Sequence, residues 1–204
     1  MRATTGEDLV IVPTGTANVA SVRAAFRRLG VEPRDAATPD DVEAAARVVL
    51  PGVGAFGSAM GAIDAAGMRD ALRDRVDADR ATLAVCVGMQ LLGESSTESP
   101  GVAGLGALSA AVSGFPAGVR VPQLGWNQVE PAAGSRYLSP GWAYFANSFR
   151  YEAPPAGWAI AVAGHGGPFV AALERGSVLA VQFHPELSGG WGTGVLSRWL
   201  ELTA

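Results

Sequence analysis

The first half of the chain alternates between short apolar runs and apolar positions at helical spacing. Mostly apolar runs predict buried strands at residues 9–12, 47–50 and 83–86. Between them, apolar residues spaced by three or four predict one helix from Val19 to Leu29 and further helical sequence from Met60 to Val76. Strands that alternate with helices favour an α/β fold, in which helices flank a mainly parallel central sheet.

Residues typical of helix ends mark the limits of these helices. Asn18 can cap the first helix, and Gly30 can end it. Thr38 and Asp41, with a proline between them, predict a capping box at the start of a short second helix. The longer helical pattern is interrupted near Gly67.

The second half of the chain is predicted to be richer in strands. Short apolar strands separated by turn residues are expected there, followed by a closing helix with one apolar face. After a segment rich in Gly, Ala and Pro at 99–125, the expected strands cover residues 143–145, 159–162, 169–173 and 178–183. The apolar face of the closing helix comprises Val195, Leu196, Trp199, Leu200 and Leu202. Because no repeat or linker interrupts the sequence, we predict a single domain over residues 1–204.

Composition and charge exclude several classes of function. The chain has 204 residues, of which 49% are apolar, and a formal net charge of −4. Its arginines are scattered instead of clustered, which argues against nucleic-acid binding, and the lack of lysine excludes Schiff-base and P-loop lysine mechanisms. No apolar run is long enough to span a membrane and the N-terminus lacks the features of a secretory signal, so we expect a cytoplasmic protein.

Cys86 is the only cysteine, and it lies between a predicted strand and a predicted helix. This arrangement is typical of a nucleophile elbow. A sulfur at the start of a helix faces unpaired backbone N–H groups, which favour the thiolate over the thiol. Gly88 fits this interpretation if a side chain two residues after the nucleophile would crowd an approaching substrate. Composition alone favours the alternative, a buried structural cysteine.

A thiolate nucleophile needs an acid/base partner, and the chain offers two histidines. His184 directly follows a predicted strand, and Glu186 is placed to orient its imidazole. His165 lies in a Gly-rich stretch and is better interpreted as a polar turn residue. The alternative interpretation of His184 and Glu186 is a histidine at a strand end beside a solvated glutamate.

These motifs resemble those of the class I glutamine amidotransferases. Residues 85–92 look like the nucleophile motif of that family, and residues 182–186 like its His-Glu motif. The loop at residues 51–57 is similar to the oxyanion loop of the glutaminase subunit of imidazole glycerol phosphate synthase. Further matches to the same subunit are residues 18–22, 28–30, 124–127, 144–145 and 167–172. The resemblance covers nearly the whole chain and implies the flavodoxin-like fold of the class.

The resemblance also implies a role for each candidate site residue. It makes Cys86 the nucleophile, His184 the general acid/base and Glu186 its orienting partner. The backbone N–H groups of Val53 and Val87 would form the oxyanion hole. The positions implied to hold glutamine are Gly54, Gln90, Glu98 and Ser148, with Glu98 suited to the substrate ammonium. The alternatives are that Gln90 is a helix-surface amide and Glu98 a solvated loop acid.

The activity implied is hydrolysis of L-glutamine to glutamate and ammonia through a thioester on the cysteine. No cofactor and no metal is expected. The family passes ammonia through a channel to a synthase partner, which by resemblance is a (β/α)8-barrel cyclase of histidine biosynthesis. Nucleic acids and membranes are not expected as partners.

Several positions depart from the pattern of the family. Residues 13–18 replace the motif Asp-Tyr-Gly-x-Gly-Asn, beginning with Pro13, and Ala84 replaces a glycine. Asn147 replaces a histidine, and Leu187 replaces a lysine. Because the N-terminal motif and that lysine lie at or near the synthase interface in the family, two alternatives stay open. One is a paralogous glutaminase that serves another synthase, and the other is a regulatory subunit without turnover.

A rival from a different class rests on glycine spacing. Gly52, Gly54 and Gly57 form the pattern G-x-G-x-x-G after a predicted strand, which is a fingerprint of dinucleotide binding. That fingerprint needs an acidic residue after the next strand, about 20 residues on. Asp70 and Asp74 instead fall in predicted helical sequence, so we regard this as the weaker hypothesis.

Overall fold

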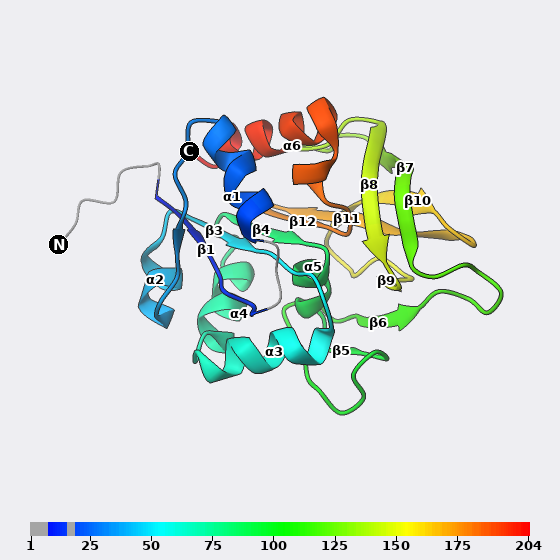
Figure 1. Cartoon of the computed structure of the whole chain (residues 1–204), viewed down its shortest axis with the longest axis horizontal. Coiled ribbons are helices and arrows are strands. Elements are labelled where there is room, and N and C mark those ends of the chain that lie inside the picture. The colour runs from blue at the N-terminus through cyan, green and yellow to red at the C-terminus, as the bar shows by residue number, and fades with distance from the viewer. Residues whose placement is uncertain (1–7, 16–18) are drawn as a thin grey trace.

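One mixed sheet organises the computed structural model, which describes residues 8–15 and 19–204 (Figure 1). Its strands are β1 (Leu9–Ile11), β2 (Arg34–Asp35), β3 (Arg47–Leu50), β4 (Thr82–Val85), β5 (Ser95–Ser96), β6 (Ala111–Gly114), β7 (Gln123–Pro131), β8 (Gly141–Asn147), β9 (Phe149–Tyr151), β10 (Ala159–Gly164), β11 (Pro168–Arg175) and β12 (Val178–Val181). The main path through the sheet is β2-β1-β3-β4-β12-β11-β10-β7-β8. Along this path the pairs β2-β1, β1-β3, β3-β4 and β4-β12 are parallel. The remaining pairs, β12-β11, β11-β10, β10-β7 and β7-β8, are antiparallel. The α/β prediction and the β-rich second half are therefore confirmed.

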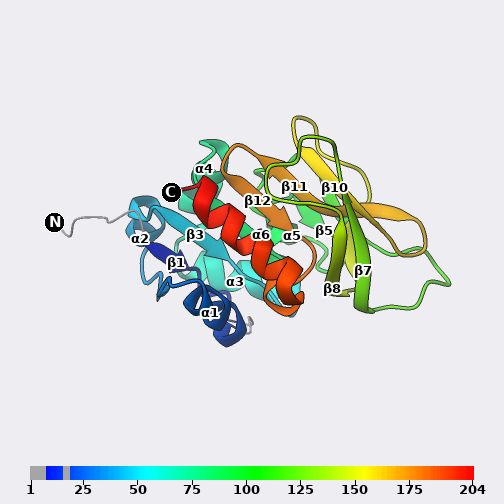
Figure 2. The same cartoon turned by 90° about the horizontal axis from the view of Figure 1, so that it is seen from above.

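Helices cover both faces of the parallel part of the sheet. They are α1 (Val19–Arg28), α2 (Pro39–Ala44), α3 (Phe56–Ala65), α4 (Arg69–Asp77), α5 (Val87–Leu91), the 3-10 turn η1 (Pro185–Leu187) and α6 (Gly189–Leu202). One face is covered by α1 and α6, which lie in front of the strands in Figure 2, and the opposite face by α3, α4 and α5. Strands buried on both faces read as continuous apolar runs, which is why β1, β3 and β4 were predictable.

The predicted helix ends are largely found. Thr38 and Asp41 form the capping box of α2, and Gly30, with φ +81°, follows the end of α1. Gly67, with φ +68°, separates α3 from α4. Asn18, the predicted cap of the first helix, lies outside the described residues.

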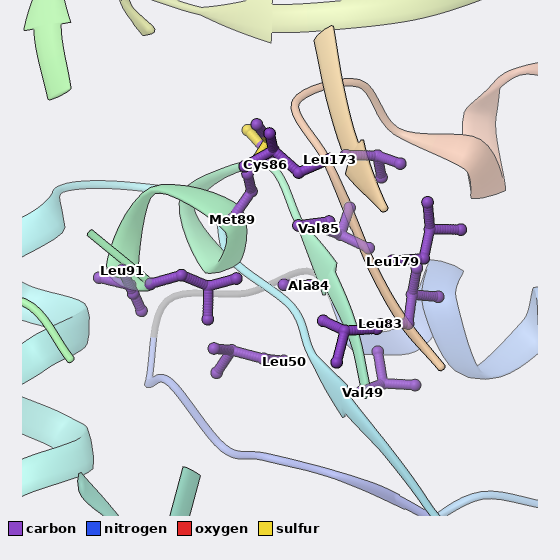
Figure 3. Packing of buried hydrophobic residues seen from close by; sticks show 14 of the residues in the cluster. Val49, Leu50, Leu83, Ala84, Val85, Cys86, Met89, Leu91, Leu173 and Leu179 are labelled. Atoms are coloured by element: carbon purple, nitrogen blue, oxygen red, sulfur yellow. The ribbon is translucent and has the colours of Figure 1, made fainter. Parts of the chain in front are cut away.

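The buried core supports the site from below. Leu83 and Val85 of β4 and Leu50 of the adjacent β3 belong to this core, and Figure 3 shows the Cys86 sulfur at the edge of the apolar cluster. On the other face, Trp199 of α6 packs edge-on against Phe26 of α1 with ring centroids 6.3 Å apart. Burial of side chains of this size contributes about 1.5–3 kcal/mol each.

That one domain spans residues 1–204 stays a prediction.

Several strand limits differ from the predictions, although the residues concerned are buried. β4 ends at Val85, so Cys86 lies just beyond it, and β12 ends at Val181 instead of residue 183. The Gly-rich segment 99–125 holds β6 and the first residues of β7, which were not predicted. No helix within residues 8–15 and 19–204 has the length and apolarity that a bilayer crossing requires.

The sheet order brings the candidate residues to one edge. β3, β4 and β12 are adjacent and parallel, so their carboxyl ends lie side by side. Gly52, Cys86 and His184 follow these three strands. Loops at the carboxyl ends of parallel strands are the usual position of sites in open α/β sheets.

Candidate active site

Cys86 occupies a sharp turn between β4 and α5. Its backbone has φ 54° and ψ −111°, a conformation that non-glycine residues rarely adopt. The Cys86 N–H donates to the Val181 carbonyl at 2.7 Å, and the Cys86 carbonyl accepts from the Gln90 N–H at 3.2 Å. These bonds hold the strained residue between β12 and α5, so the predicted elbow is confirmed as a backbone geometry.

The glycine after the elbow serves backbone packing. A Cβ on Gly88 would lie 2.0 Å from the Leu50 carbonyl oxygen, and one on Gly52 would lie 2.5 Å from the Gly88 nitrogen. The interpretation that Gly88 leaves room for a substrate is therefore wrong, because the atoms that exclude a side chain belong to the end of β3. The end of β3 can approach α5 only because both positions are glycine.

This packing also accounts for the glycine spacing that suggested a dinucleotide site. A Cβ on Gly57 would lie 2.9 Å from the Ser99 hydroxyl, and the Gly57 N–H donates to that hydroxyl at 3.0 Å. Gly54 adopts φ +90°, which favours glycine. Each glycine of the pattern thus has a structural reason that involves no nucleotide.

His184 and Glu186 form a buried pair beside the elbow. Nδ1 of His184 lies 2.9 Å from Oε1 of Glu186, and the side chains are only 5% and 7% exposed, so the alternative of a solvated glutamate is wrong. The His184 N–H donates to the Tyr144 carbonyl at 2.9 Å, and its carbonyl accepts from the Ser188 hydroxyl at 2.6 Å. Burial lowers the pKa of His184, but the Cys86 sulfur and the Glu186 carboxylate outweigh it and raise that pKa to about 10.

A cavity of about 200 Å³ opens above the sulfur. Its lining contains every predicted site residue except Glu186, which lies behind the imidazole. The lining residues are Val53, Gly54, Cys86, Val87, Gln90, Glu98, Ala146, Asn147, Ser148, Phe149 and His184. His165 is not among them; its Nε2 lies 2.7 Å from the Arg120 carbonyl, as fits a turn residue.

Two predicted substrate residues are fixed by hydrogen bonds. Gln90 is 3% exposed, and its amide nitrogen donates to the Phe149 carbonyl at 3.1 Å and to Oε1 of Gln182 at 3.0 Å, so the alternative of a helix-surface amide is wrong. Oε2 of Glu98 accepts from the Phe56 N–H at 2.7 Å and so lies at the start of α3. Glu98 is thus a half-buried acid that one of its carboxylate oxygens holds in place.

The structure adds residues that sequence reasoning gave no role. Nε2 of Gln182 donates to the Cys86 sulfur at 3.6 Å, and the Ala146 carbonyl lies 4.0 Å from that sulfur. Asn147 donates to the Phe149 carbonyl at 3.1 Å from a buried position. The available signal for Gln182 was a polar residue that interrupts an apolar strand.

Neither predicted oxyanion donor is free and directed at the cavity. The Val87 N–H donates to the Gly52 carbonyl at 3.3 Å. Because a trans peptide is planar, the N–H of Val53, which shares that peptide with the Gly52 carbonyl, points the opposite way. In this conformation one donor is occupied and the other is turned away. Within the described residues, no group of three His, Cys, Asp or Glu side chains could hold a metal ion.

Comparisons with known proteins agree on one family. The model of the family described as glutamine amidotransferase class-I matches residues 10–200. The HisH subunit of imidazole glycerol phosphate synthase from Escherichia coli K12 is 40% identical over 96% of this chain and 100% of its own length. The chloroplastic imidazole glycerol phosphate synthase hisHF of Arabidopsis thaliana is 40% identical over 98% of this chain, which spans 35% of that longer protein. A crystal structure of a glutamine amidotransferase superposes with a TM-score of 0.76 at 24% identity, covering 95% of this chain and 98% of that one.

Proposed function

This chain belongs to the class-I glutamine amidotransferases and, within them, to the HisH subunits of imidazole glycerol phosphate synthase, and we propose that Cys86, His184 and Glu186 carry out its glutaminase reaction. One observation carries the assignment: the sole cysteine, at a strained elbow, shares a cavity with a histidine that a buried glutamate orients at 2.9 Å. The raised pKa of His184 supports an imidazolium at neutral pH, ready to give its proton to a leaving group.

In the first half of the reaction, the Cys86 thiolate attacks the side-chain amide carbon of glutamine. The carbonyl oxygen becomes an oxyanion. When the carbon–nitrogen bond breaks, the His184 imidazolium gives its proton to the departing nitrogen, which leaves as ammonia. The product is a γ-glutamyl thioester on the sulfur, and His184 is left neutral, with its Nδ1 held by Glu186.

In the second half, neutral His184 takes a proton from a water molecule, whose oxygen attacks the thioester carbon. A second oxyanion forms, the carbon–sulfur bond breaks, and glutamate leaves while the thiolate and imidazolium are restored. Gly54, Gln90, Glu98 and Ser148 hold the amino-acid end of the substrate, with the Glu98 carboxylate facing its ammonium. Gln90 offers the substrate its oxygen, because its nitrogen is already bonded to Phe149 and Gln182.

The oxyanion needs a change in the loop at Gly52. While the Gly52 carbonyl accepts from the Val87 N–H, a negative oxygen in the same place would meet a carbonyl and would not be stabilised. Rotation of the peptide between Gly52 and Val53 frees one donor and aims the second. A donor of this kind is worth about 2.7–4 kcal/mol in another enzyme, so the rotation is a natural point of control.

As the sequence resemblance implies, we propose that the ammonia passes to a (β/α)8-barrel cyclase subunit. The plant relative supports a synthase partner, because it is named hisHF and this chain spans only 35% of it. An apolar face on β7, β8 and η1 supports such a partner: it comprises Leu124, Trp126, Trp142 and Leu187, which are 69%, 55%, 57% and 45% exposed. Leu124 is paired with Ala146, whose carbonyl lies 4.0 Å from the Cys86 sulfur, so this face begins at the rim of the cavity. Exposed apolar patches of this kind mark protein interfaces.

The partner experiment separates the catalytic proposal from its alternatives. The chain is combined with a cyclase subunit of imidazole glycerol phosphate synthase, and synthesis is measured with glutamine or with ammonium salts. Cys86→Ala should abolish synthesis from glutamine and leave synthesis from ammonium unchanged. A wild-type complex that uses only ammonium would mean that the chain is a regulatory subunit.

The same experiment also tests the destination of the ammonia. If the chain releases glutamate but supports no cyclase, the paralogous glutaminase is the better interpretation. Loss of both activities in Cys86→Ala would contradict a channelled glutaminase, provided that the variant binds the cyclase as the wild type does. A cytoplasmic location stays a prediction.

A further inference from the structure

Gln182 is a buried amide that the mechanism above leaves without a task. Its side chain is 0% exposed, and it lies directly after β12, two residues before His184. Its backbone N–H donates to the Ala171 carbonyl at 2.8 Å, which anchors the residue to β11. Burying an amide is costly unless its polar atoms are paired, so the partners of this side chain show what it does.

Hydrogen-bond accounting fixes the orientation of the Gln182 amide. The Gln90 nitrogen can only donate, and it does so to the Gln182 oxygen at 3.0 Å and to the Phe149 carbonyl at 3.1 Å. The Gln182 oxygen must therefore face Gln90, and its nitrogen must face the Cys86 sulfur, 3.6 Å away. A chain of donors runs from a predicted substrate residue to the nucleophile.

The other groups around the sulfur show why this donor matters. The Ala146 carbonyl, 4.0 Å away, can accept a proton from a thiol but offers a thiolate nothing. The titratable groups that share the cavity with the sulfur are His184 and Glu98, and Glu186 lies behind the imidazole. Gln182 is thus the neutral side chain that donates a hydrogen bond to the sulfur, and a donor favours the charged form.

We propose that Gln182 is a positioning residue for Cys86, holding the sulfur as a thiolate in a fixed direction, and that Gln90 keeps the Gln182 amide in the required orientation. Its use in catalysis rests on the glutaminase function proposed above. The contact with the sulfur does not, because it concerns the ionisation of Cys86 in the chain alone. The two proposals can therefore fail separately.

The test uses the single cysteine as its own reporter. Iodoacetamide reacts with thiolates, so its rate of reaction with the folded chain as a function of pH reports on Cys86 alone. Gln182→Leu removes the donor and keeps an uncharged side chain of similar length. The midpoint of alkylation should move up by about one pH unit, so that the rate below the midpoint falls about tenfold, equivalent to about 1.4 kcal/mol.

Further variants test the direction of the effect. Gln182→Glu places a negative charge beside the sulfur and should move the midpoint further up. Gln90→Leu leaves the Gln182 amide free to rotate and should give a smaller shift in the same direction. Gln123→Leu is the matched control: this glutamine is also buried, but it lies on β7 outside the lining of the cavity, so the midpoint should not move.

A measurement on the wild type keeps the test independent of how the variants fold. In nitrogen-resolved NMR spectra, the signal of one buried glutamine side-chain amide should shift with pH, with the same midpoint as alkylation. Absence of such a signal, an unchanged midpoint in folded Gln182→Leu, or an equal shift in Gln123→Leu would overturn the inference. In the cyclase complex, Gln182→Leu should lower kcat more than it raises KM. If the wild-type complex does not use glutamine at all, the glutaminase proposal is wrong, and the alkylation result still stands.

Discussion

Replacing Glu186 with glutamine tests how the triad divides its work. The substitution keeps the shape of the side chain and removes its charge. In the wild type, Oε1 of Glu186 lies 2.9 Å from Nδ1 of His184, while Oε2 is buried and has no hydrogen-bond partner among the described residues. A glutamine can therefore place its oxygen toward Nδ1 and its NH2 group where Oε2 was, so the tautomer of His184 need not change.

The structure sets the size of the expected loss. A hydrogen bond to a charged group contributes about 1.5–3 kcal/mol and a neutral one about 0.5–1.5, so the change costs about 1–2 kcal/mol of imidazolium stabilisation. This corresponds to a loss of ~5- to 30-fold in kcat/KM and lowers the pKa of His184 by about one unit. The new NH2 group lies beside a cavity of about 10 Å³ lined in part by Pro51, Gly52 and Val53. That space holds about one water, and an unpaired buried donor would add about 1–3 kcal/mol of destabilisation.

The assay is glutamate release by the cyclase complex at saturating cyclase ligand. It is accompanied by proton NMR titration of the two histidines and by urea unfolding of the free chain. Glu43→Gln serves as the control, because Glu43 is exposed on α2 and is not among the residues that line the cavity. It should leave kcat/KM, the pKa of His184 and the free energy of unfolding unchanged.

Two results would refute this reasoning. A loss of about 10⁴, as the equivalent change causes in a serine-protease triad, would mean that the amide turned its NH2 group to His184 and reversed the tautomer. An unchanged rate, with an unchanged pKa of His184, would mean that Glu186 neither orients nor charges the imidazole.

Three further predictions concern packing, pH and the partner. Gly88→Ala should destabilise the chain by at least about 1–3 kcal/mol in urea unfolding, because its Cβ would lie 2.0 Å from the Leu50 carbonyl, whereas Gly61→Ala, in a helix with open space around it, should be neutral or stabilise by up to about 1 kcal/mol. Because folding raises the pKa of His184 from 6.5 to about 10, the stability it contributes is complete below pH 6.5 and is lost as pH rises through about 10. The free energy of unfolding should therefore fall between pH 7 and 10, by up to about 1.4 kcal/mol per pH unit, and this slope should flatten in His184→Gln. Trp126→Ser should weaken cyclase binding by about 2 kcal/mol or more in calorimetry and leave iodoacetamide alkylation of Cys86 unchanged, and equal binding would exclude the apolar face as the interface.

The sequence predicted the elements that are buried on both faces and those whose ends carry their own hydrogen bonds. β3 reads as a strand because both of its faces are covered, and α2 is fixed by the Thr38 capping box, which needs no distant partner. β7 was missed because its burial alternates irregularly and Gly125 interrupts it with φ +128°. β2 and β5, of two residues each, are shorter than any recognisable period.

The same distinction applies to the site: its local patterns could be predicted, and its contacts between distant residues could not. The elbow at Cys86 and the pair of His184 with Glu186 are local patterns, so their residue types and spacing were enough to propose them. The Gln182 contact joins residues 96 positions apart, and the reason for Gly88 lies in the Leu50 carbonyl of another strand. Such contacts depend on the register between β3, β4 and β12, which no local window contains.

The two halves of the catalytic apparatus are in different states of readiness in the chain alone. The nucleophile has its partners in place: Gln182 donates to the sulfur, and Glu186 holds the imidazole. The oxyanion site does not, because the Gly52 carbonyl occupies the Val87 N–H. Alkylation needs only a thiolate, whereas glutamine hydrolysis passes through two oxyanions. It follows that the isolated chain should react readily with iodoacetamide and hydrolyse glutamine slowly, and that a partner seated on the apolar face beside the cavity would regulate the oxyanion loop instead of the nucleophile.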